Sequence, residues 1–437
     1  MQQKLSYQDI FALGFMNFAF FLGAGNIIFP PLAGALAGEE FTLTTLGFLV
    51  TAVGLPLITL LAVAKAGGGI LTMARYLPAK VALVFALVVY IIIGPSFATP
   101  RAALVAFEIG FKPFISHSDA SHLALFSVIF FGITAFLSLR AGKLLDWVGK
   151  VITPMLILSL LILAIAVFIN PQAEVGQGIT EYTSTPFIKG FLEGYNTMDT
   201  LASLIFGMFI INIIRSKGIT SAKGQYKYLM LAGSIAVIGL AFVYISLFYL
   251  GATSHTISPN PANGGELISH YVTALFGPFG QYLLSFVVAT ACLTTAVGLV
   301  SAMADFIAQL KPKWPRATLV IINCALCALV TNVGLAQLIS LSVPVLYTVY
   351  PVAIALVVLT LFKSQIRNKQ IAYALVLFVA LIFGLLDGLK VAGMNMHSFD
   401  FIPLFALGMA WVIPTAITLF ISLYLLPLPA QSELTSA

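Results

Sequence analysis

The chain is divided into about twelve apolar segments, each long enough to cross a lipid bilayer as a helix. A spanning helix needs about 20 mainly apolar residues, and in hydrocarbon only helices or closed barrels satisfy their backbone polar groups. We therefore expect an all-α polytopic membrane protein with about twelve transmembrane helices; the ninth and tenth segments nearly touch, so eleven stays open. The approximate segments are 10–37, 42–65, 80–108, 121–140, 145–169, 189–215, 226–251, 279–309, 317–336, 338–362, 371–388 and 401–426.

Composition supports a membrane protein and argues against two other classes. Only 8% of the 437 residues are charged and 60% are hydrophobic, whereas soluble domains carry about 25% charged residues. The net charge of +6 is scattered over short loops, so we expect the lipid bilayer as surroundings, no nucleic acid partner and no requirement for a protein partner.

We also expect no enzyme, because the histidines fall in or beside predicted outer loops and form no catalytic or metal cluster. They are His117, His122, His255, His270 and His397.

Lysine and arginine fall mainly in alternate loops, and this asymmetry predicts the topology. If the N-terminus is cytoplasmic, so is the C-terminus, and only Arg101, Lys112, Lys189 and Lys390 are left on the outer side or in outer halves of spans. The basic residues on the cytoplasmic side are then Lys4; Lys65, Arg75 and Lys80; Arg140, Lys143 and Lys150; Arg215, Lys217, Lys223 and Lys227; Lys311, Lys313 and Arg316; and Lys363, Arg367 and Lys369.

The first apolar segment, from about Asp9 to Ala37, is interrupted by Gly23-Ala24-Gly25-Asn26 and then by Pro30-Pro31. Glycine and proline at this depth favour a broken helix. The free amides that begin the second half can bind an anion, and the free carbonyls that end the first half can bind a cation. Close helix packing through the glycines is the alternative, and this stretch alone does not separate the two.

The sixth segment carries a second polar interruption, Glu193 to Thr200, with Asp199 inside apolar sequence. An aspartate at this depth costs about 2.5–3.5 kcal/mol, which makes Asp199 a functional candidate. Alternatively, Asn196 and Asp199 cap the second half of a broken helix. Both interpretations require a break, and the two broken segments lie five segments apart.

That spacing predicts two inverted five-helix repeats with a binding site between the broken helices. We place repeat one at about 9–170 and repeat two at about 189–362. Two additional helices follow at about 371–426, and all lie within a single transporter domain over 1–437.

Two further segments carry candidate site residues. In the eighth, Ala291, Thr294 and Thr295 share one helical face, and their oxygens suit an alkali cation; hydroxyls bonded to their own helix are the alternative. In the third, Ser96 and Phe97 lie between Pro95 and Pro100, an irregular stretch that a simple proline kink can explain.

Several of these motifs resemble known transporters. Gly23-Ala24-Gly25-Asn26-Ile27-Ile28-Phe29-Pro30 resembles the unwound first helix of the leucine-transporter fold in the amino acid, polyamine and organocation superfamily, and Ala291-x-x-Thr294-Thr295 resembles its eighth-helix sodium motif. Over essentially the whole chain, the sequence is similar to the bacterial branched-chain amino acid:cation symporters (LIVCS family). The segments that carry this likeness most closely are 14–26, 94–101 and 195–200.

The resemblance implies a secondary transporter that imports leucine, isoleucine and valine across the bacterial inner membrane by cation symport and alternating access. Na+ is the coupling ion it implies, while Asp199 leaves proton coupling open; an amino acid sensor with a transporter fold is a further alternative. Carried over by position, the amides of Ala24 and Gly25 hold the substrate carboxylate, and carbonyls around Tyr195 to Met198 receive its ammonium. The implied substrate residues are Ala24, Gly25, Asn26, Ser96, Phe97, Tyr195, Asn196, Thr197, Met198 and Asp199, and the implied sodium ligands are Ala19, Leu22, Ala291, Thr294 and Thr295.

Overall fold

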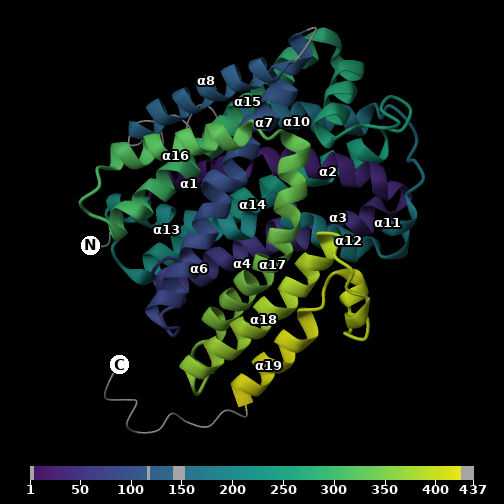
Figure 1. Ribbon diagram of the computed structural model, residues 1–437. Helices are drawn as coiled ribbons and strands as arrows, with labels where there is room; N and C mark the ends of the chain where they lie inside the picture. The colour runs from purple at the N-terminus through teal and green to yellow at the C-terminus, as the bar shows by residue number, and fades with distance from the viewer. Residues whose placement is uncertain (1–3, 116–118, 141–152, 425–437) are drawn as a thin grey trace.

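The computed structural model describes residues 4–115, 119–140 and 153–424, and every regular element in this part of the chain is a helix (Figure 1). Eight of the described helical stretches are long and apolar enough to cross a membrane, and three shorter apolar helices accompany them. Each of the twelve predicted segments contains at least one described helix. The predicted class, an all-α polytopic membrane protein, is confirmed.

The first half of the chain supplies five of the predicted segments. Residues 145–152 of the fifth segment, together with Lys143, lie outside the described residues. The elements are α1 (Tyr7–Phe21), α2 (Ala24–Ala37), η1 (Gly38–Glu40), α3 (Phe41–Leu49), the π-helical η2 (Val50–Gly54), α4 (Leu55–Ala66), α5 (Ile70–Met73), α6 (Ala79–Ile91), the π-helical η3 (Ile92–Ser96), α7 (Ala98–Gly110), η4 (Lys112–Phe114), α8 (Ala120–Leu139) and α10 (Thr153–Ile169).

The second half supplies the remaining seven segments. Its elements are α11 (Thr180–Ser184), α12 (Pro186–Glu193), η6 (Gly194–Thr197), α13 (Asp199–Ser216), α14 (Ala222–Ala252), α15 (Gly264–Leu310), α16 (Arg316–Thr331), α17 (Leu335–Phe362), α18 (Lys369–Val391), η7 (His397–Phe399), η8 (Phe405–Leu407) and α19 (Val412–Tyr424).

Both predicted helix breaks are present. The first lies between α1 and α2, where Leu22 has a non-helical ψ of 78° and Gly23 is extended. The second lies between η6 and α13, where Met198 takes a left-handed conformation with φ 63°. A third distortion occurs in the third segment, where Gly94 has a ψ of −111° and α7 begins only at Ala98.

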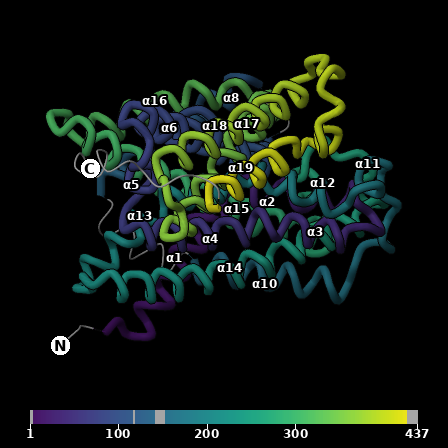
Figure 2. Tube along the Cα trace, turned by 90° about the horizontal axis from the view of Figure 1, so that it is seen from below, coloured from purple at the N-terminus to yellow at the C-terminus, as the bar shows by residue number. Residues whose placement is uncertain are grey.

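The bundle is assembled around these interrupted helices. Helix α7 packs along α15, and α14 packs against both α1 and α2. Helices α18 and α19, the two additional helices, pack against α17 at one edge of the molecule (Figures 1 and 2). The broken helices therefore lie inside the bundle, where neighbouring helices can satisfy their free backbone groups.

Contacts between loops support the predicted alternation of the two membrane sides. Ends of segments that were assigned to the cytoplasmic side meet one another, and ends assigned to the outer side do the same. On the first side the contacts are Lys217 Nζ to Asp9 Oδ1 at 2.7 Å, Lys65 Nζ to Leu361 O at 2.5 Å and Arg316 Nη1 to Ser138 O at 2.9 Å; on the second they are Ile179 N to Leu36 O at 2.9 Å and Gly176 N to Ala252 O at 3.0 Å.

The long outer stretch between the seventh and eighth segments is partly helical. Helix α15 already begins at Gly264 and is interrupted at Gly277, where φ is 63°. A side chain at Gly264 would overlap the carbonyl oxygen of Ile28, so the start of α15 lies directly on α2. Tyr271, buried in the same stretch, accepts a hydrogen bond from the amide of Gln172.

Tight helix crossings give the first testable prediction. A Cβ at Gly190 in α12 would overlap the carbonyl oxygen of Thr44 in α3, whereas a Cβ at Gly132 in α8 meets open space. We expect Gly190→Ala to destabilise the fold by about 1–3 kcal/mol, because α3 and α12 must separate, and Gly132→Ala to change stability little. Thermal unfolding of both purified variants in detergent measures the difference; equal melting temperatures would contradict the crossing.

Candidate functional site

A small cavity lies between the two helix breaks. Its volume is about 30 Å³, enough for about two water molecules, so an amino acid cannot enter unless the walls move. The cavity is lined by Phe20, Phe21, Gly23, Ala24, Gly25, Asn26, Ile93, Ala98, Arg101, Thr197, Met198, Asp199, Ala202, Phe206, Thr295 and Leu299.

The break between α1 and α2 forms one polar wall. Because α2 begins at Ala24, the amides of Ala24 and Gly25 belong to the first turn, whose donors have no partner within the helix. The amide of Gly23 donates to Asn26 Oδ1 at 3.1 Å. A Cβ at Gly25 would lie only 3.0 Å from the carbonyl oxygen of Asn196. The glycine thus allows the two breaks to approach each other, which agrees with the packing interpretation; the binding interpretation stays a prediction.

A buried network joins the two breaks to α14. Asn26 Nδ2 donates to Asp199 Oδ2 at 2.6 Å and also contacts the Tyr244 hydroxyl, which donates to the same Asp199 oxygen at 3.1 Å. All three side chains are at most 3% exposed. Hydrogen bonds to a charged group are stronger than neutral ones. We call Asn26, Asp199 and Tyr244 the carboxylate network.

The start of α13 differs from the capping interpretation. The amide of Asp199 donates to Thr197 Oγ1 at 3.3 Å, while the Asn196 side chain donates to Glu193 Oε2 at 3.0 Å. Asn196 and Asp199 therefore do not cap the helix, and that interpretation is wrong. The reason is that left-handed Met198 occupies the cap position and has no acceptor in its side chain, so the preceding threonine supplies the oxygen.

The carbonyls predicted to receive the substrate ammonium are mostly occupied. Tyr195 O accepts from Met198 N at 3.0 Å, Met198 O accepts from Ala202 N at 2.9 Å, and Asn196 O accepts from Arg101 Nη1 at 2.6 Å. The acceptors that remain for an ammonium at the cavity are the Thr197 carbonyl and the Asp199 carboxylate. Both residues line the cavity.

Four predicted substrate residues lie outside the cavity wall. The ring of Tyr195 stacks on Tyr350 at 4.3 Å, and Asn196 turns its side chain toward Glu193. Ser96 and Phe97 are half-buried but do not border the cavity; Ile93, Ala98 and Arg101 take their place. The reason is the distortion at Gly94, which changes the face that α7 presents.

Oxygen donors from α15 meet the end of α1. Thr295 Oγ1 lies 3.2 Å from the Ala19 carbonyl oxygen and 3.4 Å from that of Leu22. Thr294 Oγ1 donates to Ala291 O at 2.9 Å, within its own helix. The structure therefore brings Thr295 to the Ala19 and Leu22 carbonyls, and Thr295 also lines the cavity. The hydroxyl of Thr294 bonds to its own helix, as in the alternative interpretation.

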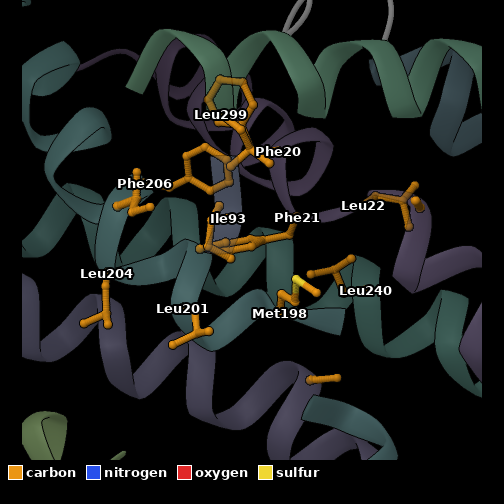
Figure 3. Packing of buried hydrophobic residues seen from close by; sticks show 14 of the residues in the cluster. Phe20, Phe21, Leu22, Ile93, Met198, Leu201, Leu204, Phe206, Leu240 and Leu299 are labelled. Atoms are coloured by element: carbon orange, nitrogen blue, oxygen red, sulfur yellow. The ribbon is translucent and has the colours of Figure 1, made fainter. Parts of the chain in front are cut away.

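The remaining wall is apolar, as Figure 3 shows for Phe20, Phe21, Ile93, Met198, Phe206 and Leu299. Phe20 stacks on Phe206 with ring centroids 5.0 Å apart and meets Phe209 edge-on at 5.7 Å. We call Phe20, Phe206 and Phe209 the aromatic layer. Phe209 also borders a second cavity of about 290 Å³, lined by Gly67–Thr72, Asn212, Asp305 and Phe306 among others. The aromatic layer thus separates the small cavity from a larger one.

Sequence reasoning missed two polar residues of this site. Tyr244 carries no signal, because tyrosine is common in membrane helices. Arg101 does carry one, since a charged residue inside an apolar segment is a functional candidate; the topology argument places it on the outer side instead. In the structure it is buried beside the cavity.

Two facing helix breaks around a small central cavity are typical of one class of membrane transporter, and solved structures share this fold. A nucleobase-cation-symport-1 family transporter in a closed conformation has a TM-score of 0.65 at 15% identity, covering 97% of this chain and 94% of that one. A Na+-coupled sialic acid symporter has a TM-score of 0.60 at 14% identity, covering 97% and 91%. The predicted leucine-transporter type of fold, with its broken first and sixth helices, is confirmed.

The chain belongs to the branched-chain amino acid transport protein family, whose pattern it matches over residues 6–427. It is 46% identical over 417 residues to the branched-chain amino acid transport system 2 carrier protein of Pseudomonas aeruginosa, with 95% of each chain covered. It is 42% identical over 426 residues to the branched-chain amino acid permease BrnQ of Escherichia coli, with 97% of each covered. The protein is thus a multi-pass transporter and not an enzyme.

The carboxylate network gives a second prediction. Tyr244→Phe removes one donor to Asp199, and the loss of one hydrogen-bond partner by a buried polar group costs about 1–3 kcal/mol. We expect a free energy of unfolding in micelles lower by that amount. Tyr249→Phe in the same helix is the control, because the Tyr249 ring stacks on Phe168 and takes no part in the network. Equal stability of the two variants would argue against the network.

Proposed function

We propose that the protein imports leucine, isoleucine and valine by sodium symport across a bacterial inner membrane, with both termini in the cytoplasm. Family membership and the relatives named as branched-chain amino acid carriers and permeases support the substrate class. The concentration of basic residues on one side supports the orientation. A small site that the aromatic layer separates from a larger cavity supports alternating access.

The cavity offers each part of a branched-chain amino acid a matching wall. The carboxylate of the amino acid would bind at the first amides of α2, those of Ala24 and Gly25. These amides form the positive end of the helix dipole. Asp199 matches the ammonium group. The apolar wall of Phe206, Leu299 and their neighbours matches an aliphatic side chain. One methylene changes affinity only about tenfold to two hundredfold, so weak discrimination among the three substrates is expected.

The observation that carries sodium coupling is the position of Thr295. Its hydroxyl lies within 3.4 Å of the Ala19 and Leu22 carbonyl oxygens. With Thr294 and the Ala291 carbonyl it would give a set of neutral oxygen donors, which suits a hard cation. The break in α1 leaves those carbonyls free of helical partners. The ion would then link the first broken helix to α15, and its differential affinity for one access state drives the cycle.

Proton coupling is the competing mechanism, because Asp199 is an ionisable group at the cavity. Leucine uptake into proteoliposomes separates the two mechanisms. We expect accumulation above equilibrium with an inward sodium gradient and none with an equal proton gradient. Accumulation with protons alone would move the coupling site to Asp199. Leucine binding without accumulation under either gradient would favour a sensor.

Substitution of the threonines tests the sodium site itself. Thr295→Val keeps the shape but removes one oxygen, and Thr294→Ala removes another, so we expect the sodium concentration for half-maximal uptake to rise about tenfold or more in each. Thr134→Val in α8 is the matched control, since its buried hydroxyl also bonds to its own helix at Phe130 O. Unchanged sodium activation in both site variants would remove this assignment.

The size of the apolar wall gives a further prediction. Ala202 lines the cavity and is 7% exposed, so Ala202→Val adds two methyl groups where a substrate side chain must fit. We expect leucine affinity to fall about tenfold and valine affinity to fall less, because valine is shorter by one methylene. Competition binding of both amino acids to the same variant measures the ratio. An equal loss for both would place Ala202 away from the side-chain end.

A further inference from the structure

Arg101 is a buried cation that lines the cavity, and the proposed function gives it no role. It lies in the first turn of α7 and is 2% exposed. Nη1 donates to the Asn196 carbonyl and Nη2 to Ser342 Oγ, each at 2.6 Å. Nε has no hydrogen-bond partner in the described part of the chain. The guanidinium is thus fixed in position but retains donor capacity.

All of its neighbours of known geometry are neutral. The two acceptors are a carbonyl and a hydroxyl, and the aromatic ring of Phe29 lies 5.3 Å from the guanidinium carbon. Within residues 4–115, 119–140 and 153–424, no carboxylate forms an ion pair with Arg101. A buried charge without a partner costs several kcal/mol, and this cost is offset when an anion binds.

Arg101 and the first turn of α2 converge on the same point. The Asn196 carbonyl oxygen accepts from Arg101 and lies 3.0 Å from the position of a Cβ on Gly25. Arg101 and the first turn of α2 therefore lie on either side of the Asn196 carbonyl, and Arg101, Ala24 and Gly25 all line the cavity. Guanidinium groups bind carboxylates through paired, charge-assisted hydrogen bonds.

We propose that Arg101 binds the carboxylate of the transported amino acid together with the amides of Ala24 and Gly25. The inference rests on the proposed function and adds a specificity-determining residue to it. Arg101 supplies the formal charge, and α2 supplies the dipole. Asp199 then faces the ammonium group, so the cavity holds one cation and one anion for a zwitterionic ligand. Amines that lack the carboxylate leave Arg101 unpaired and are rejected.

A purely structural role for Arg101 leads to different results. If Arg101 only holds α7, η6 and α17 together, its loss would lower the affinity for every ligand equally. It would also lower the stability of the empty protein. As a carboxylate ligand, it matters only for ligands with a carboxylate. Its removal from the empty protein breaks two hydrogen bonds but also eliminates a buried charge without an ion-pair partner. Because these two effects oppose each other, we expect little change in stability without substrate.

The test compares leucine with 3-methylbutylamine, which lacks only the carboxylate. Equilibrium binding of both ligands and the melting temperature without ligand are measured for the full chain in detergent, for wild type, Arg101→Gln and Arg101→Lys. Exposed Arg75→Gln is the control for the loss of an arginine. We expect wild type to prefer leucine by at least tenfold. In Arg101→Gln, leucine affinity falls about ten- to hundredfold, as for a lost hydrogen bond between charged groups, and amine affinity changes less than twofold. Arg101→Lys keeps the charge but loses the paired N–H donors of the guanidinium, so we expect an intermediate loss of leucine affinity.

Three outcomes overturn the inference. One is a wild-type preference for leucine below threefold, a result that does not depend on any variant folding. Another is an equal loss of affinity for both ligands in Arg101→Gln together with a lower melting temperature, which would assign Arg101 a purely structural role. The third is unchanged leucine affinity in a folded Arg101→Gln. In all three cases wild-type leucine transport is intact, whereas failure of the proposed function is seen as absence of leucine binding and uptake by wild type itself.

Discussion

The architecture depends on how two helix breaks inside a membrane satisfy each other's polar groups. An unpaired backbone group in hydrocarbon costs several kcal/mol, so neither break is stable alone. In this protein Asn26 of the first break holds Asp199 of the second, and Tyr244 completes the network from α14. The absence of a Cβ at Gly25 allows the close approach that this arrangement needs. The contacts that stabilise the breaks therefore also shape the candidate binding site.

The breaks, the fold and part of the site are predictable from the sequence. Glycine, proline and asparagine inside an apolar run have few explanations in a membrane helix, so Gly23 to Asn26 and Asp199 are informative. The spacing of Ala291, Thr294 and Thr295 places them on one face, and the structure brings that face to the end of α1. These features are local in sequence, and helical geometry alone connects them.

The apolar wall and the partners of buried groups are not predictable in this way. Phe206 and Leu299 line the cavity, yet nothing in an apolar segment distinguishes a residue that faces a cavity from one that faces lipid or core. Ser96 and Phe97 are displaced from the wall because the distortion at Gly94 alters the helix face by an amount that no pattern specifies. Arg101 is conspicuous in sequence, but its contacts with Asn196 and Ser342 depend on elements 95 and 241 residues away.

The aromatic layer has a consequence for the energy stored across the membrane. Phe20 and Phe206 line the cavity of about 30 Å³, and Phe209, which packs edge-on against Phe20, borders the cavity of about 290 Å³, so the three rings lie between the two cavities. Each elementary charge that leaks across 100 mV dissipates about 2.3 kcal/mol. A transporter with a permanently wet pathway would lose this free energy whether or not substrate moved. The stacked rings thus serve as a barrier to ions. Replacing them with smaller side chains should increase the ion leak even where amino acid uptake is normal.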